Sequence, residues 1–379
     1  MSDDNPHRTI RPVELLVAIV CICIAVGLLL PAIQRGEPVS GRTQCRNNLK
    51  HIALALQKYH DTYRMFPMGA MHAGSRNAPE IGPSWWYGIL PYIDQPTLFD
   101  KIAHTQSEIF FQPHVEFTYA SMPSGGSGRV QSMIRTLIAP TMRCPSSPLP
   151  EREDGDGPIT MPSYVGIAGG CDIDPESTDH ASWPDGAESP PTYRNLAKGR
   201  GPNQAIVTSS GLLPVAEHVS IADCTDGMSN VMIVGEQSDW LQDVDPAVSS
   251  LYHGDPGWNR DTARNPGGWL TGTNVVDPVP SVDPSGSAEP GEWSVDLLFN
   301  VTTVRYGPNR KRVISRVAAD SLPGCAEVMG HNNPLQSPHA GGLQVAMCDG
   351  SCQFVASAIE LRVLLQLAIR DDGESCELD

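Results

Sequence analysis

The fold of this chain is decided near its start by the stretch Leu15–Ile33, LLVAIVCICIAVGLLLPAI. This run of nineteen residues carries no charge and Arg35 follows it closely. As a helix rising 1.5 Å per residue it is about 28 Å long, close to the hydrocarbon thickness of a bilayer. We therefore expect a short leader at residues 1–12 and a retained transmembrane helix at 13–35. A cleaved secretory signal and a buried core helix are the alternatives.

A second helix is predicted directly after the apolar run. Its apolar side chains recur with the spacing of an amphipathic helix, at Leu49, Ile52, Ala53 and Leu56. We expect this helix over residues 42–63. The intervening GEPVSG at residues 36–41 holds two glycines and a proline, which predicts a bend or an interruption. Residues 36–67 are thus a linker and an amphipathic helix, and residues 68–379 form a globular domain.

Composition limits the functions that this chain can have. The 379 residues are 40% hydrophobic, which is enough for a packed core, and 35 glycines and 34 prolines favour a protein rich in loops and strands. The net charge of −17 is concentrated in residues 151–300, which carry 24 acidic and 6 basic residues. An acidic surface repels phosphate backbones, so we expect no nucleic-acid partner.

Local patterns place the elements of the globular part. Strands are predicted from alternation and β-branched residues, at 163–168, 231–234, 301–305, 312–317 and 343–347. The dipeptide Asp349-Gly350 predicts a hairpin turn before a returning strand at 352–355, and helical spacing predicts a last helix at 358–369 that covers one face of the sheet. Residues 240–295 have the composition of a long surface insertion.

Motifs for known chemistry are absent from the sequence. It contains no HExxH, CxxC, G-x-S-x-G or phosphate-binding loop, so we expect no enzyme activity. The aromatic cluster at residues 85–92 is interpreted as core packing, with a carbohydrate-binding platform as the alternative. No cofactor is expected apart from Ca²⁺, for which loop carboxylates are weak candidate ligands: Asp154, Asp156, Asp172, Asp174, Asp243 and Asp245.

The cysteines leave the disulfide pattern largely open. Cys348 and Cys352 flank the predicted hairpin turn and are the best local candidates for a disulfide. The sequence gives no pairing for the other cysteines outside the apolar run, which are Cys45, Cys144, Cys171, Cys224, Cys325 and Cys376.

Several stretches together carry a family resemblance. They are CRNNLKHIALALQKYHDTYRMFP (Cys45–Pro67), SWWYGILPYIDQ (Ser84–Gln95), Arg143-Cys144-Pro145, SYVGIAGG (Ser163–Gly170), DCTDGMSNVMIVGE (Asp223–Glu236) and HAGGLQVAMCDG (His339–Gly350). In this order, after an apolar helix that begins VELL, they resemble the bacterial DUF1559 family, which has a prepilin-type N-terminus and an H-x9-DG signature. The signature here is His339, Asp349 and Gly350.

The resemblance implies an α+β, pilin-like fold, in which a long N-terminal helix is embedded in the membrane and packs on an antiparallel sheet with long loop insertions. It also implies a single-pass inner-membrane protein whose globular domain is extracytoplasmic. The basic residues on the two sides of the span do not decide this orientation. Thr9-Ile10-Arg11-Pro12 departs from the prepilin processing motif, which argues against cleavage. Glu14 matches the acidic residue that pairs with a neighbouring pilin subunit, and it also suits the first turn of a helix.

The H-x9-DG residues have a physical interpretation of their own. Ten residues of extended chain separate His339 from Asp349 by up to about 30 Å, so the two lie at opposite ends of a strand and form no catalytic dyad. We interpret Asp349-Gly350 as structural, and His339 either as a packing residue or as a ligand.

Two functions follow as hypotheses. The first is a non-enzymatic pilin-like envelope protein with a structural or interaction role, whose partners are the bilayer and other pilin-like subunits or the secretion and pilus machinery. The second is an anchored extracytoplasmic module that binds a ligand such as polysaccharide. An unbroken helix from residue 13 to 60 favours the first, and a bent helix beside an open cleft favours the second.

Overall fold

The computed structural model describes the chain in segments. These are residues 12–75, 78–110, 137, 139–149, 152–153, 159–171, 197–198, 206–243, 251–253, 268–270, 272–273, 298–310, 312–314 and 332–373. The chain forms two compact units, Met1–Thr43 and Gln44–Asp379.

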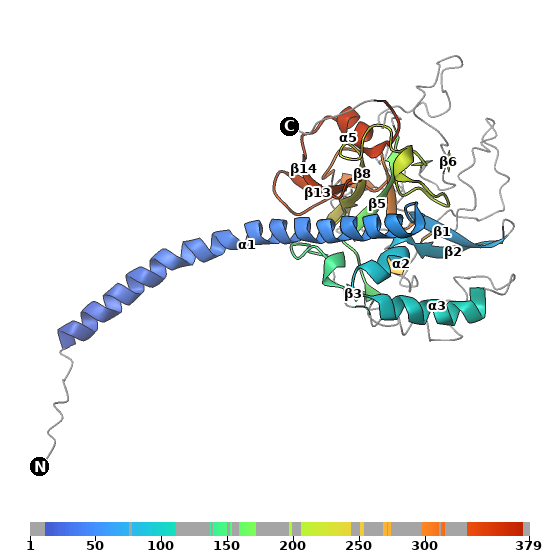
Figure 1. Cartoon of the computed structure of the whole chain (residues 1–379). Coiled ribbons are helices and arrows are strands. Elements are labelled where there is room, and N and C mark those ends of the chain that lie inside the picture. The colour runs from blue at the N-terminus through green and yellow to red at the C-terminus, as the bar shows by residue number, and fades with distance from the viewer. Residues whose placement is uncertain are drawn as a thin grey trace, which may run out of the picture. The chain divides into compact units, whose positions relative to one another are not determined.

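The first element is the helix α1, Pro12–Tyr63, which is 52 residues long (Figure 1). It begins at a proline, which fits the first turn of a helix, and it ends where the amphipathic pattern ends. Of the bend or interruption predicted at residues 36–41, the interruption is wrong, because the helix continues through these residues. Each of the two glycines costs a helix about 1 kcal/mol and the proline about 3 kcal/mol, so the helix continues here against local propensity. Among the helices in the described part of the chain, none has both the length and the apolar character that crossing a membrane requires.

The second unit is built on a five-stranded sheet with the order β11-β5-β8-β13-β14. These strands are β5 (Tyr164–Gly170), β8 (Met232–Glu236), β11 (Val301–Val304), β13 (Gly342–Met347) and β14 (Cys352–Ala356). The fold is α+β, as predicted, but the sheet is mixed. β11 pairs parallel to β5, while the other three pairs are antiparallel. A parallel pair needs a long connection, and the chain between β5 and β11 supplies one.

Each face of this sheet is covered by a helix. On one face, the helix α5 (Leu361–Ala368) packs Leu364 and Leu367 against a cluster that includes Val165 and Val345. On the other face lies the C-terminal part of α1 (Figure 1). Its apolar positions are buried in one cluster with residues such as Ile233. The predicted amphipathic helix and the predicted sheet-covering helix are both confirmed.

Further elements complete the second unit. The helix α2 (Trp85–Ile89) leads into the 3-10 turn η1 (Leu90–Tyr92), and α3 (Pro96–Phe110) follows. A second small sheet has the order β10-β9-β12, from Leu251–His253, Trp240–Asp243 and Arg312–Ile314. Short hairpins are β1/β2 (Ala70–Ser75, Ala78–Ser84), β3/β4 (Arg152–Glu153, Ile159–Thr160) and β6/β7 (Ala197–Lys198, Ile206–Val207). The remaining 3-10 turns are η2 (Pro140–Met142), η3 (Ile221–Asp223) and η5 (Gly268–Leu270).

Residues 240–295, predicted to be a surface insertion, also contribute to the core. Besides two strands, this stretch contributes Trp269 and Leu270 to the core, where both are fully buried. The abundance of glycine and proline around them gave the segment the composition of a loop, although single large apolar side chains within it reach the interior.

Candidate functional site

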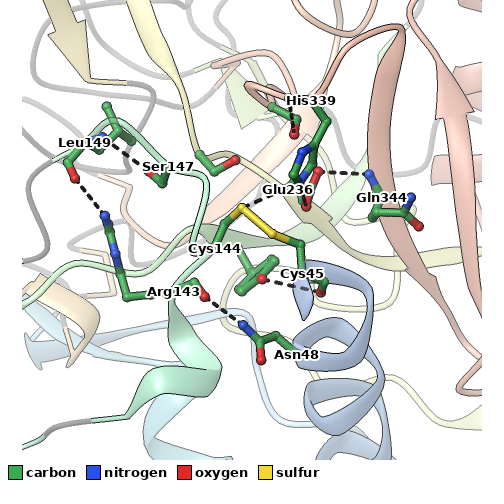
Figure 2. The surroundings of a disulfide bond; sticks show 12 residues. Cys45, Asn48, Arg143, Cys144, Ser147, Leu149, Glu236, His339 and Gln344 are labelled. Atoms are coloured by element: carbon green, nitrogen blue, oxygen red, sulfur yellow. Dashed lines mark hydrogen bonds and ion pairs between the residues drawn. A yellow bond between two sulfur atoms is a disulfide. The ribbon is translucent and has the colours of Figure 1, made fainter. Parts of the chain in front are cut away.

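A disulfide bond joins the helix α1 to a distant loop, and the candidate site is built around it (Figure 2). Cys45 lies on α1, and Cys144 lies two residues after η2. Their Cα atoms are 5.1 Å apart, and the two cysteines are 99 residues apart in the sequence. Both side chains are buried. The bond therefore fixes α1 to the loop that precedes β3.

A histidine and a carboxylate lie against the disulfide. His339 Nε2 is 3.7 Å from the Sγ atom of Cys144 and 3.8 Å from Oε1 of Glu236. Glu236, the last residue of β8, is fully buried, and its Oε2 accepts a hydrogen bond of 2.9 Å from the backbone N–H of Gln344. The backbone N–H of His339 donates to Ser337 Oγ at 3.2 Å. Two hydrogen bonds thus hold the carboxylate and the segment that carries the imidazole.

Strand register brings Glu236 to this place. Tyr164 on β5 pairs with Glu236 on β8, so their side chains share the sheet face that α1 covers. The hydroxyl of Tyr164 donates to the backbone carbonyl of Cys45 at 3.4 Å. Burial, with the carboxylate of Glu236 as a second cause, raises the pKa of Tyr164 well above its usual value. Tyr164 therefore stays protonated and can donate at any physiological pH.

Polar contacts between α1 and the loop of Cys144 reinforce the bond. Asn48, one turn after Cys45, donates from Nδ2 to the carbonyl of Arg143 at 2.7 Å. The guanidinium of Arg143 donates in turn to the carbonyls of Leu149 and Met161, at 2.8 and 2.9 Å. Figure 2 shows Asn48 on α1 pointing toward the backbone of Arg143, next to the disulfide. The loop is thus held to the helix by a covalent bond and by hydrogen bonds.

The donor atoms of this site are close enough to bind one ion. One atom each from Cys45, Cys144, Glu236 and His339 lie within 4.8 Å of one another, and all four residues are buried. In the disulfide form the two sulfurs are bonded to each other, so the imidazole and the carboxylate are the remaining metal-binding groups. In this form the arrangement is a buried covalent link with a histidine–glutamate pair beside it.

The signature residues separate as predicted. His339 comes before β13 and Asp349 comes after it, so they lie at opposite ends of this strand. Asp349 is exposed, and its Oδ1 accepts a hydrogen bond of 2.7 Å from the N–H of Ser351. Gly350 has a φ of +85°, which is a conformation that glycine adopts readily. Asp349 and Gly350 thus lie in the turn after β13, whereas His339 lies beside the disulfide.

The predicted disulfide between Cys348 and Cys352 is not formed, and neither residue is in a disulfide. They lie at the two ends of the turn, with Cys348 facing α1. Its thiol is hydrogen-bonded to that of Cys224, and this contact and burial raise its pKa. Burial raises the pKa of Cys352 to about 11. Proximity in sequence was thus a poor guide to the partner of Cys348.

Most of the other predicted site residues cannot be placed relative to this site, because they lie outside the described part of the chain. Asp243 ends β9, whereas the remaining calcium candidates lie outside the described residues: Asp154, Asp156, Asp172, Asp174 and Asp245. Glu14 lies on the first turn of α1, and its side chain is outside the described part. The tryptophans Trp85 and Trp86 are buried and stacked at 4.0 Å between ring centroids, so core packing is confirmed for both and they form no carbohydrate platform.

The sequence alone gives no sign that Cys45, Cys144, Glu236 and His339 lie together. Their separations of about a hundred residues carry no local spacing signal. One pattern was available, because each of the four lies in a different one of the stretches that carry the family resemblance. Their meeting gives those stretches a common structural purpose.

Comparison with known proteins yields one match. Residues 40–362 match the model of a family described as a protein of unknown function, DUF1559. No curated protein and no solved structure matches the chain. The matched range includes all four residues of the disulfide site.

Proposed function

Because the chain belongs to the DUF1559 family of proteins of unknown function, we propose that it is a pilin-like, membrane-anchored envelope protein. It is a non-enzymatic, single-pass protein of the inner membrane, and its globular unit lies on the extracytoplasmic side. Its role is structural or interactive, as in a pseudopilin. Its partners are the bilayer and other pilin-like subunits or the secretion and pilus machinery.

The observation that carries this proposal is the continuity of α1. The helix assignment runs from Pro12 to Tyr63, so one element includes the uncharged stretch and the apolar positions buried in the globular core. This continuity supports the structural role, for which we expected an unbroken helix from residue 13 to 60.

The anchor is proposed from the sequence and from the exposed side chains of α1. Val13, Leu16 and Ile22 are 70%, 64% and 62% exposed, which is unusual for a run of large apolar residues in water. Lipid tails would remove this apolar surface from water, at about 25 cal/mol per Å². The uncharged length of about 28 Å matches such a role.

The disulfide supports the extracytoplasmic location. Disulfides persist in oxidising compartments and are rare in the cytosol, where thiol reductants keep cysteines reduced. The bond between Cys45 and Cys144 lies in the second unit and holds α1 to the loop after η2. A disulfide in the globular unit therefore favours an extracytoplasmic location for this unit. The basic residues around the span do not decide the orientation.

The experiment is fractionation of cells that produce the full chain, with a carbonate wash and no detergent. We expect the wild type in the membrane pellet. The variant Ile19→Lys/Ile22→Lys places two charges in the uncharged run, each costing about 2.5–3.5 kcal/mol near the centre of a span, so it should move to the supernatant. The control Leu54→Lys changes a 45% exposed residue of the same helix in the second unit and should stay in the pellet. Recovery of the wild type in the aqueous supernatant would contradict the proposal.

A further inference from the structure

We propose that Cys45, Cys144, Glu236 and His339 form a zinc site when the disulfide is reduced, so that zinc and the S–S bond are alternative links between α1 and the loop after η2. In the oxidised chain the bond holds Cys45 to Cys144. In the reduced chain the same sulfurs bind the metal together with His339 and Glu236. This inference does not depend on the proposed membrane role, because it concerns the second unit alone.

The geometry fits tetrahedral zinc. With Zn–S of about 2.3 Å and Zn–N or Zn–O of about 2.0–2.1 Å, ligand atoms around a tetrahedral ion are about 3.3–3.8 Å apart. His339 Nε2 already lies at 3.7 Å from one sulfur and 3.8 Å from Oε1 of Glu236. The sulfurs must separate to about 3.7 Å. Rotation of the two side chains can provide this separation, since their Cα atoms are 5.1 Å apart.

The donor set selects the metal. Two thiolates and one imidazole are the ligands of zinc and not of calcium or magnesium, which take oxygen ligands. All four residues are buried and come from α1, the loop after η2, β8 and the segment before β13. Four protein ligands with no exposed position are typical of a structural zinc site.

The surrounding hydrogen bonds orient these ligands as a metal site requires. The N–H of Gln344 donates to Oε2 of Glu236, which leaves Oε1 as the oxygen nearest the imidazole. Asn48 holds the backbone beside Cys144. Such contacts fix ligand orientation independently of the S–S bond, so they persist after reduction.

Reduction of the disulfide by a thiol precedes metal binding. Two equivalents of a small thiol, or one dithiol, supply two electrons and two protons and become a disulfide, while the bond between Cys45 and Cys144 becomes two thiols. Zn²⁺ then binds both sulfurs as thiolates, and their two protons pass to solvent. In the reverse direction, a small-molecule disulfide accepts the two electrons by thiol–disulfide exchange and leaves as two thiols, the bond between Cys45 and Cys144 re-forms, and Zn²⁺ is released.

The test uses the full chain in detergent, synthesised cell-free under reductant so that both thiols are free, which alkylation and mass spectrometry verify. The reduced protein is equilibrated with zinc, desalted, and assayed for bound metal and for melting temperature. We expect the wild type to hold one more zinc per chain than Cys45→Ser/Cys144→Ser, and to melt at a higher temperature with zinc than without it. Cobalt substitution should give the intense visible bands and thiolate charge-transfer absorption of a tetrahedral site.

Single variants and a matched control make the outcome specific. Glu236→Gln and His339→Gln keep both cysteines and should weaken zinc binding at least tenfold. Cys352→Ser removes a cysteine outside the site and should bind as the wild type does. Equal zinc in the reduced wild type and the double serine variant would overturn the inference, as would full affinity in both single variants. Neither result would affect the membrane fractionation.

Discussion

Replacing both Cys45 and Cys144 with serine removes the covalent link between α1 and the loop after η2. The bond closes a loop of 99 residues. Cross-linking a loop of about 100 residues lowers the entropy of the unfolded chain by an amount worth about 4.7 kcal/mol at 25 °C, and measured losses for native disulfides are about 2–5 kcal/mol. We therefore expect the free energy of unfolding to fall by about 4 kcal/mol. Both cysteines are changed together, so that no single buried thiol remains to mispair.

The assay is urea unfolding of the full chain in detergent, followed by tryptophan fluorescence. With a slope of about 3 kcal/mol per molar urea, the midpoint should fall by about 1.3 M. Reduced wild type with a metal chelator should behave like the double variant. The control Cys352→Ser changes a half-buried cysteine outside any disulfide and should cost less than about 1 kcal/mol. A loss below about 1 kcal/mol in the double variant would refute the reasoning, because a closed loop of this length cannot be worth so little.

Three further predictions concern residues outside the disulfide site. Desolvation lowers the pKa of His60, whose Nε2 accepts a hydrogen bond from the backbone N–H of Ile221. The unfolded chain therefore binds more protons than the folded chain, and the free energy of unfolding should fall as the pH drops below about 6.5. The variant His60→Gln should flatten this pH dependence, measured by urea unfolding between pH 7.5 and 5.5. Gly350→Ala places a side chain at a φ of +85° and should lower the free energy of unfolding by about 1–2 kcal/mol, measured by thermal melting. The control Gly307→Ala adds a carbon with no atom within 4 Å and should lower it by less. Equal decreases in the two variants would contradict this prediction. The hydrogen-bonded thiols of Cys224 and Cys348 should form a disulfide when oxygen or a small-molecule disulfide is added, which takes up the two hydrogen atoms. A peptide map in which either cysteine is linked to a different cysteine would contradict this prediction.

Local signals in the sequence predicted the regular elements well. The hairpin of β13 and β14 was predictable because alternation and an Asp-Gly pair are short-range features. The end of α1 and the position of α5 followed from helical periodicity. These features depend on neighbours in the chain, so the sequence alone is sufficient to find them.

Other features depend on contacts that sequence patterns do not encode. The glycines and proline at residues 36–41 predicted a break by local propensity, which the long helix overrides. Trp269 is in the core although its neighbours have the composition of a loop. The parallel pairing of β11 with β5 follows from tertiary packing after a long excursion of the chain.

The disulfide site was the least predictable feature. Cys45 and Cys144 were only two among several unassigned cysteines, and the pairing suggested by proximity, Cys348 with Cys352, is wrong. Glu236 gave no signal as a site residue, because a glutamate at the end of a strand is ordinary. His339 was recognised as a packing residue or a ligand, and the fold was needed to show what lies beside it.

The most direct measurement traps thiols in intact cells with a membrane-permeant alkylating agent, before lysis, and maps the peptides of the membrane fraction without reduction. We expect a linked peptide pair that contains Cys45 and Cys144, recovered from the membrane pellet. Alkylation of both cysteines in the mature protein would contradict the claim that an oxidised, exported globular unit is locked to α1.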